Sequence, residues 1–317
     1  VKEGIFGLAT RLYGITFHRC EDLPVYHPDV EAYEVRDEDG SYLAVLYADF
    51  YPRENKQSGA WMTSYAEQFV DQEGEDHRPH VSITMNLTKP TADRPSLLTL
   101  GEVETFLHEF GHALHGIFSR VRFMSLSGTN VYWDFVELPS QFMENWCYDA
   151  KTVKAFARHV ETHAPIPDAL LARVRAAKND RAATASLRQL AFARLDMALH
   201  VDPPADPNAL KARIFADDMP GATVPEDRFL NAFTHIFAGG YAAGYYGYKW
   251  SEVMSADVFG AFEEAGLDDE EAVRRVGRRY RETFLALGGS VDPMEVFRRF
   301  RGRAPSPEAL LRQTGLK

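Results

Sequence analysis

Residues 108–112 read His108-Glu109-Phe110-Gly111-His112. In a helix, residues four apart lie on one face, so both imidazoles can reach one metal ion at about 2.0–2.1 Å. Glu109 projects to the side of that ion, where a carboxylate can take a proton from an attacking water. The stretch therefore predicts a helix that carries a zinc site together with its own general base.

The third metal ligand must come from elsewhere, because a catalytic zinc ion usually keeps three protein ligands and one open position. His115 lies seven residues after His108, about 10 Å further along a helix, so we interpret it as a core or supporting histidine. A site with three histidines would need the third at position 118, where the chain has Phe118. Glu137 and Glu144 in the next helical stretch are the remaining candidates, and we favour Glu137.

Glu137 has two interpretations. With Asp134 as the residue that precedes a helix, it stands where a capping-box carboxylate would. Its neighbours Phe135, Val136 and Leu138 are apolar, however, and an unpaired carboxylate is costly in such a setting. A metal partner removes that cost, so we expect Glu137 to be the third ligand.

Residues 235–250 form a second unusual passage, in which glycines alternate with the tyrosines Tyr241, Tyr245, Tyr246 and Tyr248. Glycine lets the backbone approach a ligand closely, and a tyrosine hydroxyl donates a neutral hydrogen bond at pH 7. Aromatic residues at this density more often serve packing. Beside a metal motif, we expect some of these hydroxyls to stabilise an oxyanion.

The composition restricts the class of protein. The 317 residues are 45% apolar, enough for a sizeable core in one large domain or two closely packed ones. A net charge of −11 argues against nucleic acid or an anionic membrane as the main partner. The only cysteines, Cys20 and Cys147, fit no metal or redox pattern, and no apolar run is as long as a membrane span. We therefore expect a cytoplasmic protein with reduced thiols.

Hydrophobic periodicity predicts two regions of different structure. Before Leu98 we expect a helix over 3–14, strands over 31–36, 42–50 and 81–87, and a hairpin turn at 37–40. After Leu98 we expect helices over 101–118, 134–149, 150–163, 168–178, 180–199, 207–216, 226–237, 244–264, 269–286, 292–300 and 306–314. The prediction is a mainly α fold with a small antiparallel or mixed sheet, organised as one domain with a sheet region in 1–98 and a helical region with the metal site in 99–317.

Two further expectations concern individual segments. If residues 81–87 form an edge strand, they can hold an extended peptide beside the metal, although the same pattern fits a core strand. His159 and His163 also lie four apart on a predicted helix, but no glutamate follows the first histidine and Pro165 ends the helix. We interpret this pair as structural or facing solvent.

With these residues in view, the chain resembles the thimet oligopeptidase family of zinc peptidases (M3), most closely its oligopeptidase A branch. The resemblance covers essentially the whole chain and is carried by the strings Phe106–Gly116, Trp133–Trp146, 235–250, Tyr51–Lys56, Gly59–Met62 and Phe300–Arg303. It implies a zincin-type metallopeptidase domain that cleaves short, unstructured peptides. The dipeptidyl carboxypeptidases of the same family are the enzymatic alternative.

The resemblance also implies roles for individual residues. One zinc ion would be held by His108, His112 and Glu137. Glu109 would be the general base, and Tyr248 would stabilise the tetrahedral intermediate. Assistance at the scissile carbonyl or the nearby substrate backbone would come from Tyr241 and His235.

Members of that family are usually about twice as long, with an N-terminal helical half that forms the opposite wall of a deep channel. This chain corresponds to the catalytic C-terminal half. Apolar surface that would face the other half is then exposed, covered by self-association, or paired with a separate chain. A third alternative is therefore a half-enzyme that binds metal and peptides without cleaving them.

Overall fold

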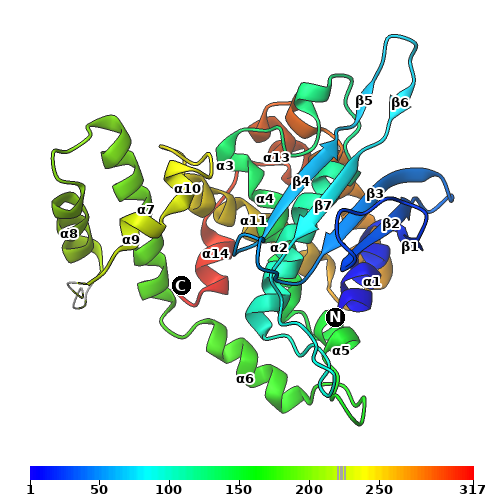
Figure 1. Ribbon diagram of the computed structural model, residues 1–317, viewed down its shortest axis with the longest axis horizontal. Coiled ribbons are helices and arrows are strands. Elements are labelled where there is room, and N and C mark those ends of the chain that lie inside the picture. Colours follow the sequence, from blue (N-terminus) through cyan, green and yellow to red (C-terminus); the bar gives the residue numbers. More distant parts are fainter. Residues whose placement is uncertain (220, 222–223, 225) are drawn as a thin grey trace.

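Figure 1 shows the computed structural model, which describes residues 1–219, 221, 224 and 226–317. Its strands are β1 (Thr16–Cys20), β2 (Val30–Arg36), β3 (Tyr42–Asp49), β4 (Trp61–Ala66), β5 (Phe69–Val70), β6 (Asp76–His77) and β7 (His80–Thr84). Its α-helices are α1 (Lys2–Tyr13), α2 (Leu100–Ile117), α3 (Trp133–Val136), α4 (Leu138–Glu144), α5 (Ala150–Phe156), α6 (Asp168–Lys178), α7 (Ala182–Val201), α8 (Pro207–Asp218), α9 (Phe229–Ala232), α10 (Thr234–Phe237), α11 (Tyr246–Ala265), α12 (Glu270–Tyr280), α13 (Pro293–Arg301) and α14 (Glu308–Gln313). Short turns of 3-10 or π type are η1 (Met124–Leu126), η2 (Asn145–Tyr148), η3 (Arg281–Leu285) and η4 (Gly288–Ser290). Across the described ranges, each helix is too short or too polar to cross a membrane.

The predicted mainly helical fold with a small mixed sheet is confirmed. The five strands of the main sheet lie in the order β1-β2-β3-β7-β4, and β3 pairs with β7 in parallel while the other pairs are antiparallel. The hairpin turn between β2 and β3 forms as predicted, with Gly40 at a φ of 84°. Strands β1 and β4 were not predicted, because their alternation is weak and their residues are largely half-exposed.

The expectation that residues 81–87 form an edge strand is wrong. β7 lies between β3 and β4, and Val81 and Ile83 are completely buried, so this segment is the core strand of the alternative interpretation. A strand with neighbours on both sides has no free row of backbone groups for a ligand. The two edge strands of the sheet are β1 and β4, and β4 contacts the helix α2.

Most predicted helices are confirmed to within two residues at each end. The helix predicted over 150–163 is wrong beyond Phe156, because Ala157 adopts extended backbone angles and His163 has a φ of 55°. His159 and His163 therefore do not share a helical face, although both are exposed as expected. The helix predicted over 226–237 begins at Phe229 and is interrupted at Phe233, whose ψ of 62° is not helical.

Glu137 interrupts the helix predicted over 134–149. It ends α3 and precedes α4, with a backbone ψ of −4° that departs from the helical value. Pro139 follows in the first turn of α4, where its missing N–H leaves no helical hydrogen bond unmade. A single straight helix is thus the wrong prediction, and the break sets the direction of the Glu137 side chain.

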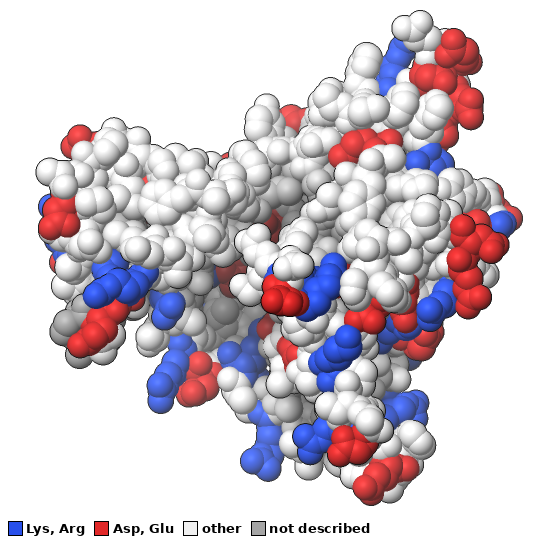
Figure 2. Space-filling view, viewed as in Figure 1, with Lys and Arg blue, Asp and Glu red and all other residues white. Residues whose placement is uncertain are grey.

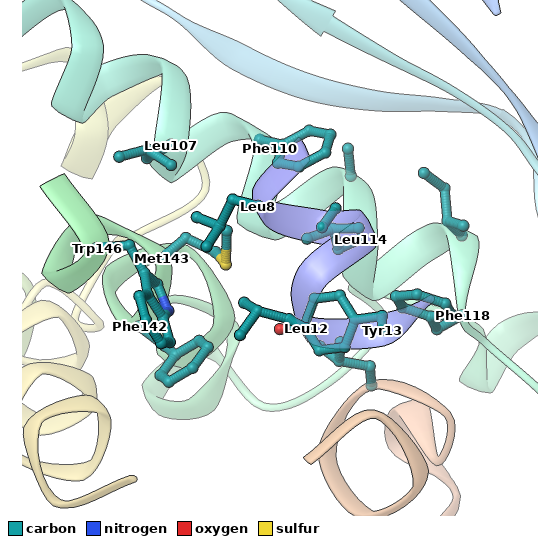
Figure 3. Packing of buried hydrophobic residues seen from close by; sticks show 14 of the residues in the cluster. Leu8, Leu12, Tyr13, Leu107, Phe110, Leu114, Phe118, Phe142, Met143 and Trp146 are labelled. Atoms are coloured by element: carbon teal, nitrogen blue, oxygen red, sulfur yellow. The ribbon is translucent and has the colours of Figure 1, made fainter. Parts of the chain in front are cut away.

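The main hydrophobic core lies where α1, α2 and α4 meet beneath the sheet. Figure 3 shows Leu8 and Leu12 of α1 between the α2 side chains Phe110 and Leu114 and the aromatic side chains Phe142 of α4 and Trp146 of η2. The Thr99 side chain and Glu102 close a capping box at the start of α2, which fixes the first turn of that helix. The helix that carries the two predicted metal ligands is therefore held at its start and along its buried face.

A second, smaller core is formed by apolar residues of α7, α8 and the segment 229–245. Phe192 is its centre, with Phe215, Phe229, Phe233 and Tyr245 around it. In Figure 1 these helices lie at the left, on the opposite side of the molecule from the sheet. Among the described residues these are the two largest of three hydrophobic clusters, and residues 235–250 connect these two.

Gly111 is the point of closest approach between α2 and α4. A Cβ atom at this position would lie 2.4 Å from the carbonyl oxygen of Pro139 and 2.6 Å from the Cα atom of Ser140. Both are backbone atoms, so the two helices would have to separate to make room. Glycine is therefore required here for packing rather than for its backbone angles.

We expect Gly111→Ala to destabilise the protein by about 1–3 kcal/mol, because an added methyl group forces two packed backbones apart. Gly101→Ala is the matched control, since Gly101 lies on the same helix with open space around its Cβ position. Urea unfolding of the two variants measures the difference. Equal stability of both variants would contradict the packing role of Gly111.

Candidate metal centre

Three predicted ligands converge at one point. α2 presents His108 and His112 one turn apart, and the Nε2 atom of each lies 3.2 Å from the same Oε2 atom of Glu137. The three donor atoms lie within 4.8 Å of one another. Two imidazole nitrogens and a carboxylate oxygen in this arrangement form a donor set that a divalent metal ion accepts, with space for a fourth ligand.

Glu137 is almost fully buried, with 2% of its surface exposed. Burial opposes its ionisation, but the charges and hydrogen bonds of His112 and His108 outweigh that effect and hold its pKa well below the ordinary value. Within the described ranges, no lysine or arginine forms an ion pair with this carboxylate. The capping alternative is wrong, because Tyr132 is the residue that precedes α3 and it makes no side-chain cap. The buried charge therefore favours a positive charge beside the two imidazoles, which a metal ion would supply.

Glu144 contacts the other side of His108. Its Oε1 atom lies 2.6 Å from Nδ1 of His108, so it cannot also reach the point where the Nε2 atoms meet. Burial lowers the tendency of His108 to protonate, but hydrogen bonds to Glu137 and Glu144 outweigh it and raise its pKa well above the ordinary value. Such a carboxylate fixes the orientation of a ligating imidazole and increases its basicity. Glu144 follows Glu137 by two helical turns, and this spacing was the signal in the sequence that could have indicated its role beside His108.

Glu109 lies next to the three converging side chains. Its side chain lines the same cleft and is 5% exposed, and its Oε2 atom has no hydrogen-bond partner within the described part of the chain. Burial raises its pKa, while the two histidines act in the opposite direction. A carboxylate with a free oxygen and a raised pKa has the properties of a general base.

The tyrosine segment supplies the opposite wall. The Tyr241 hydroxyl donates a hydrogen bond to Oε1 of Glu137, so in this structure it contacts the candidate ligand. Tyr248 stacks on Tyr241 with ring centroids 4.9 Å apart. His235 is exposed at the rim, with its ring 6.0 Å from that of Tyr248. All the predicted site residues therefore lie in one place.

The cleft that these residues line has a volume of about 600 Å³ and continues into a second hollow of about 750 Å³. Gly59, Ala60, His108 and Glu109 line both parts. The edge strand β4 borders the first part at Trp61 and Met62. Figure 2 shows the surface hollowed between the sheet and the helices α7 and α8. The candidate metal centre thus lies in an open groove with an edge strand of the sheet along one side.

Comparison with known proteins identifies the family to which this chain belongs. The sequence pattern described as Peptidase family M3 matches residues 1–316. The chain belongs to peptidase family M3. This confirms the family that the residue strings around the metal motif predicted.

Three relatives show how much of an M3 protein this chain represents. It is 46% identical to a probable cytosolic oligopeptidase A of Arabidopsis thaliana over 326 residues, which is 100% of this chain and 46% of that protein. It is 43% identical to oligopeptidase A of Escherichia coli (strain K12) over 320 residues, 99% of this chain and 46% of that protein. A dipeptidyl carboxypeptidase of the same organism is 38% identical over 321 residues, again 100% and 46%. The chain spans less than half the length of these curated relatives.

Solved structures confirm the zincin-type fold of the M3 chain. Metallocarboxypeptidase 1 of Trypanosoma cruzi matches with a TM-score of 0.55 at 16% identity, over 74% of this chain and 53% of that chain. A carboxypeptidase of Pyrococcus furiosus matches with a TM-score of 0.53 at 15% identity, over 99% of this chain and 57% of that chain. At such low identity the likeness concerns the fold alone.

His115 of the M3 motif helix lies in the core. It is completely buried, and neither ring nitrogen has a hydrogen-bond partner among the described residues. Burial, with a smaller contribution from His112, lowers its pKa from 6.5 to about 3. The native state therefore keeps this imidazole neutral.

A neutral buried histidine makes stability depend on pH. Below about pH 6.5 the unfolded chain binds a proton at His115, whereas the native state does not bind it until about pH 3. The native state therefore loses stability as the pH falls. We expect His115→Leu to reduce the loss of stability between about pH 7.5 and about pH 5.5 by about 1.4 kcal/mol. Urea unfolding of both proteins at the two pH values measures the difference. Parallel pH profiles would show that His115 is not the group responsible.

Proposed function

We propose that this chain is the catalytic part of a zinc-dependent oligopeptidase that hydrolyses peptide bonds in short, unstructured peptides. The observation that carries the proposal is the meeting of both Nε2 atoms with Oε2 of Glu137, directly beside the buried and unpartnered carboxylate of Glu109. Membership of family M3 supports the same reaction class. Two imidazoles, one carboxylate and an open position favour one zinc ion per chain.

The metal centre and the base divide the chemistry between them. Bound zinc supplies a Lewis acid that polarises the scissile carbonyl and lowers the pKa of water. Glu109 takes the proton from the attacking water and passes it to the leaving amine. Its raised pKa suits both transfers, because it brings the carboxyl closer to the pH at which it must accept and release a proton.

Hydroxyl groups from the tyrosine segment complete the site. Tyr248 lines the cleft opposite Glu109, and its neutral hydroxyl is suited to donate a hydrogen bond to the developing oxyanion. Tyr241 is held against Glu137, so its first role is to orient that ligand. His235 at the rim is placed to contact substrate backbone rather than the reacting carbonyl.

The substrate is an extended peptide that pairs with β4. This strand is one of the two edges of the sheet, and its residues Trp61 and Met62 line the cleft beside the candidate metal centre. An extended peptide satisfies unpaired main-chain groups at such an edge and places successive carbonyls along it. The preference for unstructured peptides follows, because a folded substrate has no free strand to offer.

Two further proposals concern partners and location. Large apolar side chains are exposed on the segments that contribute to the groove. Trp133 lines it, and Tyr132, Phe237 and Trp250 lie within two residues of lining residues, with 52–69% of their surface accessible. We propose that a second copy or an N-terminal half as in longer relatives covers this surface.

Cytoplasmic location is supported by the name of the Arabidopsis relative reported above.

Glu109→Gln tests the base directly. We expect turnover of a fluorogenic peptide to fall about 10²–10⁴-fold while one zinc ion per chain remains bound, since the amide cannot accept the proton. Zinc is measured by elemental mass spectrometry in the same samples. Glu161→Gln, at an exposed position of the segment after α5, is the matched control and should keep full activity. A wild-type chain that binds zinc and peptide without cleaving would instead establish the inactive half-enzyme.

A second measurement separates the two enzymatic candidates. We expect cleavage at internal bonds of a peptide, at equal rates with a free or an amidated C-terminus, because Glu102, Glu104 and Glu144 line the neighbouring hollow and would repel a terminal carboxylate. Mass spectrometry of the digests identifies the cleaved bonds. Stepwise release of dipeptides from the free acid alone would identify a dipeptidyl carboxypeptidase.

A further inference from the structure

The tyrosine segment is held by a buried carboxylate that lies far from it in sequence. Asp196 of α7 has none of its surface exposed. Its two oxygens accept hydrogen bonds from the backbone N–H groups of Ala243 and Tyr245, each at 2.9 Å. His200, one turn later on α7, also lies close, with its Nδ1 atom 2.9 Å from Oδ1. Asp196 thus bonds the backbone between Tyr241 and Tyr248 from behind the cleft.

The backbone at this point is in a conformation that it does not adopt without support. Ala243 has a φ of 54°, in the left-handed region that residues with a Cβ atom rarely enter. Such a conformation persists when the surrounding structure holds it. Charge-assisted hydrogen bonds to a carboxylate are the stronger kind, and Asp196 makes them at Ala243 itself and two residues later.

The two halves of the site belong to different hydrophobic clusters. His108 and Glu137 lie on α2 and at the start of α4, which pack in the main core, whereas α7 and Tyr245 pack in the second core. From the main core, Gln141 of α4 donates a hydrogen bond to the Tyr248 carbonyl at 3.0 Å. Asp196 is the matching polar attachment to the second core, so the tyrosine segment is fixed from both sides.

A burial cost accompanies this arrangement. Among the described residues no lysine or arginine forms an ion pair with Asp196, and an ionised carboxylate is costly to bury without such a partner. An apolar residue in the same place would fill the volume but could not bind two N–H groups. The contacts that Asp196 makes therefore point to control of backbone conformation as its purpose.

We propose that Asp196 is a positioning residue of the active site. It sets the backbone of residues 241–248 so that Tyr241 reaches Glu137 and the Tyr248 hydroxyl lines the cleft. The proposal rests on the proposed peptidase function for its catalytic consequence. Its structural part, the attachment of the segment to α7, stands independently of that function.

Asp196→Asn tests the proposal, because the amide keeps the shape of the side chain but presents a donor to one of the two N–H groups. We expect kcat for a fluorogenic peptide to fall at least about tenfold, with zinc content unchanged and KM within about twofold. Hydrogen–deuterium exchange of peptides that cover 241–248 should be at least about tenfold faster than in the wild type. The Asp196→Ser variant, which keeps one acceptor and leaves room for water, serves if the Asn variant does not fold.

Asp257→Asn is the matched control. Asp257 lies in the second half of α11, is almost completely buried and accepts hydrogen bonds from Arg301, Arg303 and the Ser306 N–H, none of which belongs to the tyrosine segment. Its variant should accelerate exchange around residues 301–306 and leave kcat unchanged.

Unchanged exchange over 241–248 in the Asp196 variant would overturn the proposal. So would equal losses of kcat in the Asp196 and Asp257 variants, which would indicate general destabilisation. If the wild-type chain shows no turnover, the proposed function fails, and the exchange measurement still decides whether Asp196 holds the segment.

Discussion

The contact between α2 and α4 at Gly111 is the constraint on which the metal centre depends. His108 and His112 lie on one side of α2, and Glu137 reaches them because α4 packs with its backbone against Gly111. The helix is interrupted at Glu137, and Pro139 follows in the first turn of α4. This interruption directs the carboxylate toward α2 rather than along its own helix. A residue chosen for packing thus determines whether a ligand from a second helix can reach the histidines. The metal motif and its spacing are sufficient for two ligands, and helix packing supplies the third.

Electrostatics explains why the centre needs a cation. Glu137 is buried between two imidazoles and the Tyr241 hydroxyl, and Glu144 stands behind His108. The pKa of His108 is raised and that of Glu137 is lowered. Both shifts have the same cause, because positive charge is favoured at the point where the two side chains meet. Protons on the histidines supply part of this positive charge. A bound divalent ion would supply it and would leave Glu109 as a carboxylate with an oxygen free for proton transfer.

Local sequence was a good guide where chemistry and periodicity act over a few residues. The four-residue spacing in α2 and the apolar neighbours of Glu137 led to the ligand set that the structure brings together, and periodicity located most helices. The failures were non-local. β4 has too weak an alternation to be recognised, so the sequence left open whether residues 81–87 form an edge strand or a core strand. Asp196 carried no signal at all, because its partners lie 47 and 49 residues away and are backbone N–H groups that any sequence provides.

The division of the site between two hydrophobic clusters bears on what half of an M3 protein can do. The ligands and Glu109 depend on the main core, and the tyrosines depend on the second core, but both cores lie within this chain. The groove beside β4 is open, with exposed aromatic side chains on its rim. The candidate ligands, Glu109 and the tyrosines are therefore brought together by residues of this chain. Under the proposed function, a partner that enclosed the groove would affect the length of peptide admitted and the exclusion of water. Metal binding and proton transfer would then use residues of this chain, and size selection would depend on whatever encloses the groove.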